Sequence, residues 1–225
     1  MKTVIQILIS AVIGFIVATL MLNNFTLDLF KYADAIVVII LFIIVILLGV
    51  SFKIYWQVKK LHNTEADGDE EDEVDLLIYK KFADHSFFIH SSIVLSVLVL
   101  CTTLITSQSV YLTIIAIVTM ILSYLFTIYM TNLIRLIYPE RNIPNISDSK
   151  YEEKILEIAD EGEKHVMFIG FYKSYNLMNV ALFIAIVLST LYSVTTNHSQ
   201  LFSIIVMSFV LIIVNGKYCF SVRNK

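Results

Sequence analysis

Charged residues are scarce in this chain. Asp, Glu, Lys and Arg make up 16% of its 225 residues, against roughly 25% in soluble domains. None of the four occurs between Asp84 and Arg135, and a second uncharged interval separates Lys173 from Lys217. Hydrophobic residues account for 58% of the chain, and the mean hydropathy is +0.80. This composition argues against a soluble protein and predicts an all-α integral membrane protein.

Cysteine is also rare. Cys101 and Cys219 lie in or beside apolar runs, more than a hundred residues apart, and the sequence holds no CxxC motif and no Cys/His cluster. A disulfide framework or a zinc site would need closely spaced pairs of such residues. We therefore expect two free thiols that pack among apolar side chains.

Signatures of membrane enzymes and metal sites are missing. HExxH, Gly-x-Ser-x-Gly and a glycine-rich phosphate loop do not occur, and Glu152-Glu153 lacks the following arginine of a prenyl-protease-type motif. His85 and His90 are five residues apart, so they do not share a helix face, and His165 has no second ligand at helical spacing. The connections 53–84 and 135–173 carry net charges of −4 and −2, which give nucleic acid no electrostatic attraction. We expect no enzymatic activity, no catalytic residue, no metal, no cofactor and no nucleic-acid partner.

Six stretches are long and apolar enough to cross the roughly 30 Å hydrocarbon core of a bilayer as helices. A cleaved signal peptide is the alternative for the first, but that run is long for such a peptide and Leu20-Met21-Leu22 offers no small-residue cleavage pattern. The pattern predicts one membrane domain over residues 1–225, with six transmembrane helices in three hairpins. The predicted spans are residues 3–22, 35–51, 87–105, 110–133, 177–191 and 201–215.

The distribution of basic residues predicts the orientation of the spans. Fifteen of the 16 Lys and Arg residues fall at the termini or in the connections 53–84 and 135–173, and only Lys31 lies on the opposite side. Basic residues resist translocation across the membrane. We therefore expect a multi-pass protein of the cell membrane, with both termini and these two connections in the cytoplasm.

The first of these connections is strongly acidic. Residues 65–75 carry eight Asp or Glu side chains, whose mutual repulsion favours an extended and solvated chain. We expect the connection 53–84 to be flexible, with docking of a basic partner or loose binding of a divalent cation as the alternatives. An EF-hand is not supported, because Asp72 stands where its turn requires glycine.

The second connection is expected to contain an amphipathic helix. Pro139 should end the fourth span near Tyr138, and Ser149 with Glu152 forms a capping box for a helix over residues 149–166. The apolar stripe of this helix is expected on the membrane surface or on the ends of the spans, and a partner-binding face is the alternative. The candidate partner-binding residues are Glu153, Asp160, Glu161, Glu163, His165 and Lys173.

Small residues spaced four apart predict faces on which helices pack closely in lipid. A substrate path is the alternative role for these rows. The predicted spans contain no Asp, Glu, Lys or Arg, which disfavours an ion-coupled transporter. The two rows are Ser10, Gly14 and Ala18 in the first span, and Ala181, Ala185 and Ser189 in the fifth.

Four segments, residues 138–144, 159–167, 171–176 and 200–204, carry a resemblance to a known family. The chain resembles an uncharacterised family of multi-span membrane proteins from Gram-positive bacteria, known as the domain of unknown function DUF3169. The resemblance covers most of the chain and is strongest from Leu133 onward. It implies no activity, so no catalytic residue is carried over from it.

Two functions follow from these patterns. The first is a non-enzymatic accessory or regulatory protein, embedded in the lipid bilayer, that acts on a membrane or cytosolic protein partner through its cytosolic connections. The second is a small permease, or a toxin-resistance or export component, that moves an apolar or peptide substrate through a homo-oligomer. A membrane-embedded hydrolase would need a nucleophile and a base at one depth of the bilayer.

Overall fold

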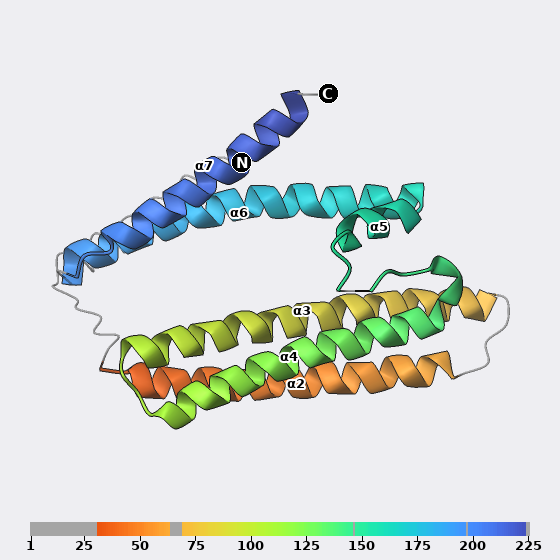
Figure 1. Cartoon of the computed structure of the whole chain (residues 1–225), viewed down its shortest axis with the longest axis horizontal. Helices are drawn as coiled ribbons and strands as arrows, with labels where there is room; N and C mark the ends of the chain where they lie inside the picture. The colour runs from red at the N-terminus through yellow and green to blue at the C-terminus, as the bar shows by residue number, and fades with distance from the viewer. Residues whose placement is uncertain (1–30, 64–68, 146, 197, 224–225) are drawn as a thin grey trace, which may run out of the picture. The chain divides into compact units, whose positions relative to one another are not determined.

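The computed structural model describes residues 31–63, 69–145, 147–196 and 198–223. These residues form helices and their connections, with no β-strand among them (Figure 1). Within this described part, 5 helices are long and apolar enough to cross a membrane. The all-α membrane class is therefore supported. The predicted span 3–22, with Ser10, Gly14 and Ala18, lies outside the described residues, so six spans in three hairpins stay a prediction.

Several helices are much longer than the predicted spans. At about 1.5 Å per residue, the 37 residues of α3 and the 36 residues of α6 each measure about 55 Å. A bilayer core is only about 30 Å thick, so both helices are long enough to extend well beyond it. The elements are α2 Ala33–His62, α3 Asp69–Ile105, α4 Val110–Ile137, the 3-10 helix η1 Pro139–Arg141, α5 Tyr151–Ile158, α6 Glu161–Thr196 and α7 Leu201–Arg223.

The acidic connection differs from the flexible chain expected over residues 53–84. Helix α2 continues to His62 and α3 already begins at Asp69, so most of this stretch is helical. The backbone of residues 69–73 is already helical, so α3 begins within the acidic stretch. Charge density alone predicted an extended chain and did not show that the helix starts there.

The single helix expected over residues 149–166 is also wrong. Helix α5 ends at Ile158, Ala159 has an extended backbone with φ −71° and ψ 138°, and α6 starts at Glu161. The acidic first turn of α6 favours a new helix start at this point. Ser149 does not cap α5 either: the N-cap residue is Lys150, which makes no side-chain capping bond.

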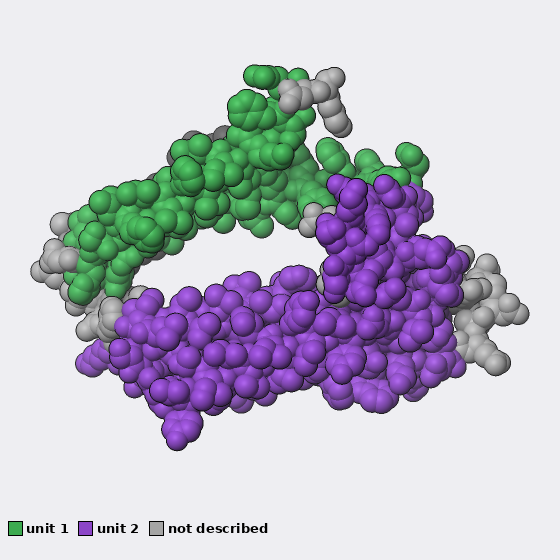
Figure 2. Space-filling view, viewed as in Figure 1, with its two compact units in different colours: residues 1–28, 161–225 green, residues 29–160 purple. Residues whose placement is uncertain are grey.

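The chain divides into two compact units, residues 29–160 and residues 1–28 with 161–225 (Figure 2). In the unit of residues 29–160, α2, α3 and α4 lie side by side as a three-helix bundle (Figure 1). In the other unit, the described part is the pair α6 and α7, which pack against each other.

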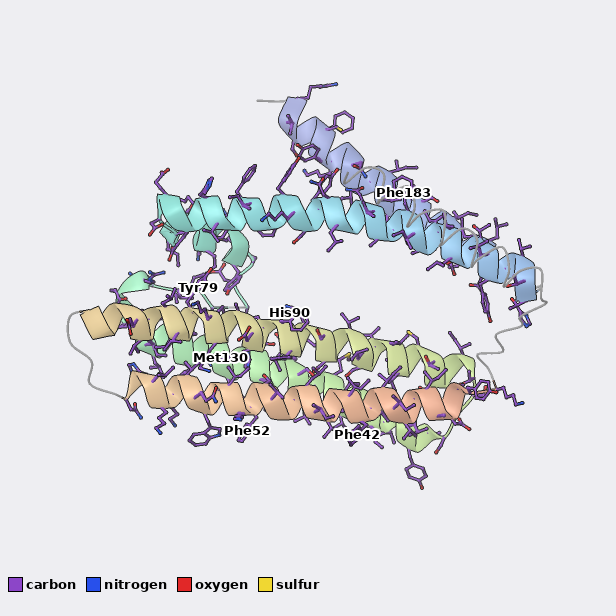
Figure 3. The ribbon with its side chains drawn as sticks, turned by 180° about the vertical axis from the view of Figure 1, so that it is seen from behind. Phe42, Phe52, Tyr79, His90, Met130 and Phe183 are labelled. Carbon is purple, nitrogen blue, oxygen red and sulfur yellow. The ribbon has the colours of Figure 1, made fainter. Side chains whose placement is uncertain are left out.

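The three-helix bundle has two apolar clusters. Met130 lies between the helices, whereas Phe42 points outward from α2 and is 66% exposed (Figure 3). One cluster comprises Ile54, Val58, Ile78, Met130 and Leu133, and the other Val37, Ile44, Val99 and Ala116.

Small polar residues join α3 to α4. Ser92, Ser96, Thr119 and Ser123 are buried, and the hydroxyl oxygens of Ser96 and Thr119 lie 3.0 Å apart across the two helices. Ser92 and Ser96 are four residues apart on α3, and Thr119 and Ser123 are four residues apart on α4. This spacing of small residues allows close helix packing in lipid. The same rule that predicted rows in the first and fifth spans would have found these residues.

Candidate functional site

The chain that follows α4 is held against α3 by a tyrosine. Helix α4 ends at Ile137 with Tyr138 as its C-cap, which confirms that Pro139 stops the helix there. The Tyr138 hydroxyl donates a 2.9 Å hydrogen bond to a carboxylate oxygen of Asp75 on α3. The Arg141 guanidinium lies 5.5 Å from the centre of the Tyr138 ring, within the range of a cation–π contact. Tyr138 thus fixes the direction in which the chain leaves the bundle.

The protonation state of Tyr138 suits this role. Burial raises the pKa of the Tyr138 phenol well above its ordinary value, and the hydrogen bond to Asp75 raises it further. The phenol therefore remains protonated, and remains a donor to the Asp75 carboxylate, throughout the physiological pH range.

A hollow of about 460 Å³ with both polar and apolar walls lies beside Tyr138. Asn132 and Arg135 line it from α4, and Asn142 lines it from the chain after η1. Asn142 adopts the left-handed conformation, with φ 46° and ψ 41°, which asparagine tolerates better than most residues. Arg135 is exposed. One guanidinium and two carboxamides, with no carboxylate lining the hollow, provide hydrogen-bond donors for an acidic group.

Short-range bonds order the chain between the hollow and α5. The Asn145 side chain accepts a hydrogen bond from the backbone of Ser147 at 3.3 Å, and Asp148 accepts one from Lys150 at 3.0 Å. Asp148 also pairs with the ammonium group of Lys154. These contacts hold the pKa of the half-buried Asp148 carboxyl below its ordinary value. The turn before α5 is therefore built by its own side chains.

Helix α5 is amphipathic over two turns. Tyr151 and Ile155 are half-buried, Ala159 at its end is buried, and Glu153 is exposed on the other side. Glu153 pairs with Lys150 at 3.8 Å between two exposed side chains. Such an exposed pair contributes little to stability, so Glu153 is accessible to another binding partner.

The six predicted partner-binding residues are divided between the two units of the chain. Glu153 and Asp160 belong to the unit of residues 29–160, whereas the other four lie on α6 in the second unit. Those four are Glu161, Glu163, His165 and Lys173, of which Glu163 is half-buried and the others exposed.

The predicted packing row on α6 is placed unevenly. Ala185 and Ser189 are half-buried, whereas Ala181 is exposed. A polar cluster that the sequence patterns did not predict lies at the other end of the α6 and α7 pair. The Tyr175 hydroxyl donates to the side-chain oxygen of Asn215, whose amide nitrogen donates to the Asn179 side-chain oxygen at 2.6 Å.

The signal for this cluster was an asparagine inside an apolar run. A carboxamide in lipid is costly unless it finds a hydrogen-bond partner, so Asn179 within the predicted fifth span required one. Its own amide nitrogen donates to the Tyr175 carbonyl at 2.9 Å, and the ring of Tyr175 lies 5.1 Å from that of Tyr218. The cluster therefore binds α6 to α7.

Tyr138→Phe is expected to loosen the chain after α4. The variant loses the hydrogen bond to Asp75, worth about 1 kcal/mol, so hydrogen exchange of the η1 amides should rise about fivefold. Mass spectrometry of the exchanged protein measures this change. Tyr124→Phe is the matched control, because Tyr124 is 52% exposed on α4. Loss of its hydroxyl group should leave the hydrogen exchange of the η1 amides unchanged. Equal exchange in the two variants would contradict the anchoring role.

These features define the class of the protein as an all-α, multi-span membrane protein. The chain belongs to the family described as protein of unknown function (DUF3169), whose model matches residues 2–222. The family resemblance of the sequence is thereby confirmed. No curated protein and no solved structure matches the chain.

Proposed function

We propose that this protein is a non-enzymatic accessory or regulatory component of the cell membrane, which docks a protein partner on residues 138–160. The single observation that supports this function best is the set of contacts within the described part of this segment. Tyr138 is bonded to Asp75 and Asp148 to Lys154, while the described charged side chains lie largely on the surface. A preorganised surface loses less conformational entropy when a partner binds.

The charges of the segment indicate the chemistry of the partner. The hollow beside Tyr138 offers Arg135, Asn132 and Asn142 to an acidic side chain, and a carboxylate can accept two hydrogen bonds from one guanidinium. We therefore propose that the partner inserts an Asp or Glu there. Lipid phosphate is the competing anion, and the experiment below distinguishes the two.

The proposed orientation supports the same function. Arg135, Arg141, Lys150 and Lys154 all lie in or beside this segment, and basic residues next to a span favour the cytoplasmic side. We propose that both termini and the connections 53–84 and 135–173 face the cytoplasm, where a regulatory partner would reach them.

Crosslinking in intact membranes tests the proposal. A photo-crosslinking amino acid in place of Glu153 should capture a protein, and Arg135→Gln should lower that yield roughly tenfold by removing a charged hydrogen bond. Arg223→Gln is the matched control, because Arg223 is an exposed arginine at the end of α7. An unchanged yield with Arg135→Gln would reject docking at the hollow. Labelling of Glu153→Cys from outside the cell would reject the orientation.

A small permease, or an export component for an apolar or peptide substrate, is the second candidate. It is favoured by α6, in which no described residue is buried, so its surface is available to a second copy of the chain. Protein reconstituted in liposomes should then show flux of an amphipathic peptide. Flux would favour this candidate over the accessory role.

A further inference from the structure

A cavity of about 220 Å³ lies inside the three-helix bundle, away from the proposed docking segment. Phe52 and Tyr55 line it from α2, His85 from α3, and Phe126 and Tyr129 from α4. Phe52 is 51% exposed and Tyr129 is 58% exposed, so the cavity lies directly beneath the outer surface of the bundle. Phe52, Tyr55 and His85 lie just beyond the predicted spans 35–51 and 87–105, so the cavity is at the boundary of the bilayer core, where a molecule dissolved in the membrane would reach it.

His85 is the unusual member of this set. Its side chain is only 2% exposed, and no described residue forms a hydrogen bond or an ion pair with its ring. Neither ring nitrogen is among the described polar atoms that are completely buried without a partner, so the imidazole keeps access to the cavity that it lines. Because the imidazole lines the cavity, its N–H donor is available to a ligand there.

The side chains that line the cavity argue against a charged ligand. No Asp, Glu, Lys or Arg lines the cavity, and an unpaired charge would be costly in such a site. Four aromatic rings surround the imidazole, and aromatic rings favour stacked or edge-on contact with another flat ring. The rings of Phe52 and Phe126 are already stacked, with centroids 6.1 Å apart. The walls therefore suit a flat, uncharged ring.

The volume of the cavity and its single imidazole donor narrow the choice of ligand. An apolar cavity of about 150 Å³ accommodates benzene, so 220 Å³ has room for a larger, fused ring system. The ring must carry an oxygen that accepts a hydrogen bond from the His85 imidazole. It must also dissolve in the membrane from which the cavity is reached. A quinone combines a flat neutral ring, carbonyl acceptors and solubility in lipid.

We propose that this cavity binds the ring of a membrane-soluble quinone, with a carbonyl oxygen accepting a hydrogen bond from His85. The ring lies among Phe52, Tyr55, Phe126 and Tyr129, and any apolar tail leaves through the exposed side of the bundle. The inference concerns binding alone and is independent of partner docking at residues 138–160.

The chain contains a natural reporter for this site. Trp56 is its single tryptophan, and its ring lies 6.2 Å from Phe52 and 6.3 Å from Tyr55, both of which line the cavity. Quinones quench tryptophan fluorescence at short range. Menadione, a tailless naphthoquinone, should quench Trp56 in the detergent-solubilised full chain with a saturable concentration dependence. A tryptophan ester in the same micelles measures quenching by partitioning alone.

Histidine variants on the same helix test the hydrogen bond. His85→Leu should weaken menadione binding roughly fivefold to tenfold, and His85→Gln, which retains a donor, should weaken it less. His90→Leu is the matched control, because His90 is exposed, does not line the cavity, and has its Nδ1 2.7 Å from the Ser86 carbonyl oxygen. Its effect should be less than twofold. If His85→Leu does not fold, Phe126→Leu removes one aromatic wall and should also weaken binding.

Three outcomes would overturn the proposal. The first is quenching that does not saturate. The second is equal affinity in the wild type and in the folded His85 and Phe126 variants. The third is a rise in unfolding temperature with naphthalene, which has the ring but no oxygen, as large as the rise with menadione. That result would assign the cavity to any apolar ring or lipid tail.

Discussion

Met130→Ala is expected to lower the free energy of unfolding of the three-helix bundle by about 2–3 kcal/mol. Met130 is 1% exposed and packs among Ile54, Val58, Ile78 and Leu133. Removing a large buried side chain usually costs about 2–5 kcal/mol, part of it lost transfer energy and part the cavity left behind. In lipid the transfer part is small because the surroundings are also apolar. The loss of packing contacts still applies in lipid, and it sets the lower end of the expected range of unfolding free energy.

Unfolding in mixed detergent micelles, followed by far-ultraviolet circular dichroism, measures this loss. Leu136→Ala is the matched control on the same helix, because Leu136 is 72% exposed and its truncation should cost less than about 0.5 kcal/mol. Similar losses in the two variants would mean that Met130 is not at the centre of the bundle.

Asn215→Leu is expected to separate the ends of α6 and α7. It removes the acceptor of the Tyr175 hydroxyl and the donor to Asn179. Hydrogen bonds between helices in membranes contribute about 1–2 kcal/mol in model systems. The leucine also leaves Asn179 with an unpaired oxygen in an apolar setting. We expect hydrogen exchange along the second half of α7 to rise roughly fivefold to thirtyfold.

Two further variants separate the hydrogen bonds from other effects of leucine. Asn176→Leu changes an exposed asparagine of α6 beside Tyr175, and the exchange of α7 should then change less than twofold. The double variant Asn179→Leu with Asn215→Leu removes both carboxamides, and replacing both partners by apolar groups is often nearly neutral. It should therefore recover part of the loss. This explanation would be contradicted if the hydrogen exchange of α7 changed in the double variant by as much as the effects of the two single variants combined.

The location of the long helices could be predicted from the sequence, because placing a charged residue in lipid costs free energy. The uncharged interval between Asp84 and Arg135 contains the apolar parts of α3 and α4, and the interval between Lys173 and Lys217 contains those of α6 and α7. The full helix lengths were not visible in this way. Outside lipid, charged residues are compatible with helix and coil alike, so hydropathy marks only the segment within the membrane.

The candidate site was predicted in part. Pro139 correctly marked the end of α4, because proline lacks the backbone donor and cannot continue the helix. The break at Ala159 was missed, because apolar periodicity on both sides of it read as one helix. The contact of Tyr138 with Asp75 joins residues 63 positions apart in the chain. Only the packing of α3 beside α4 brings these two side chains together, so no local pattern could reveal it.

Helix α3 has one further consequence for how the protein could work. Its 37 residues include neither proline nor glycine, the residues at which sharp helix kinks usually occur. It therefore runs as one continuous helix, without a proline or glycine at which it would kink sharply. Tyr138 binds α3 near its start, at Asp75, and Thr119 binds it in its second half, at Ser96. A displacement of the chain after α4 would therefore act directly on the start of α3.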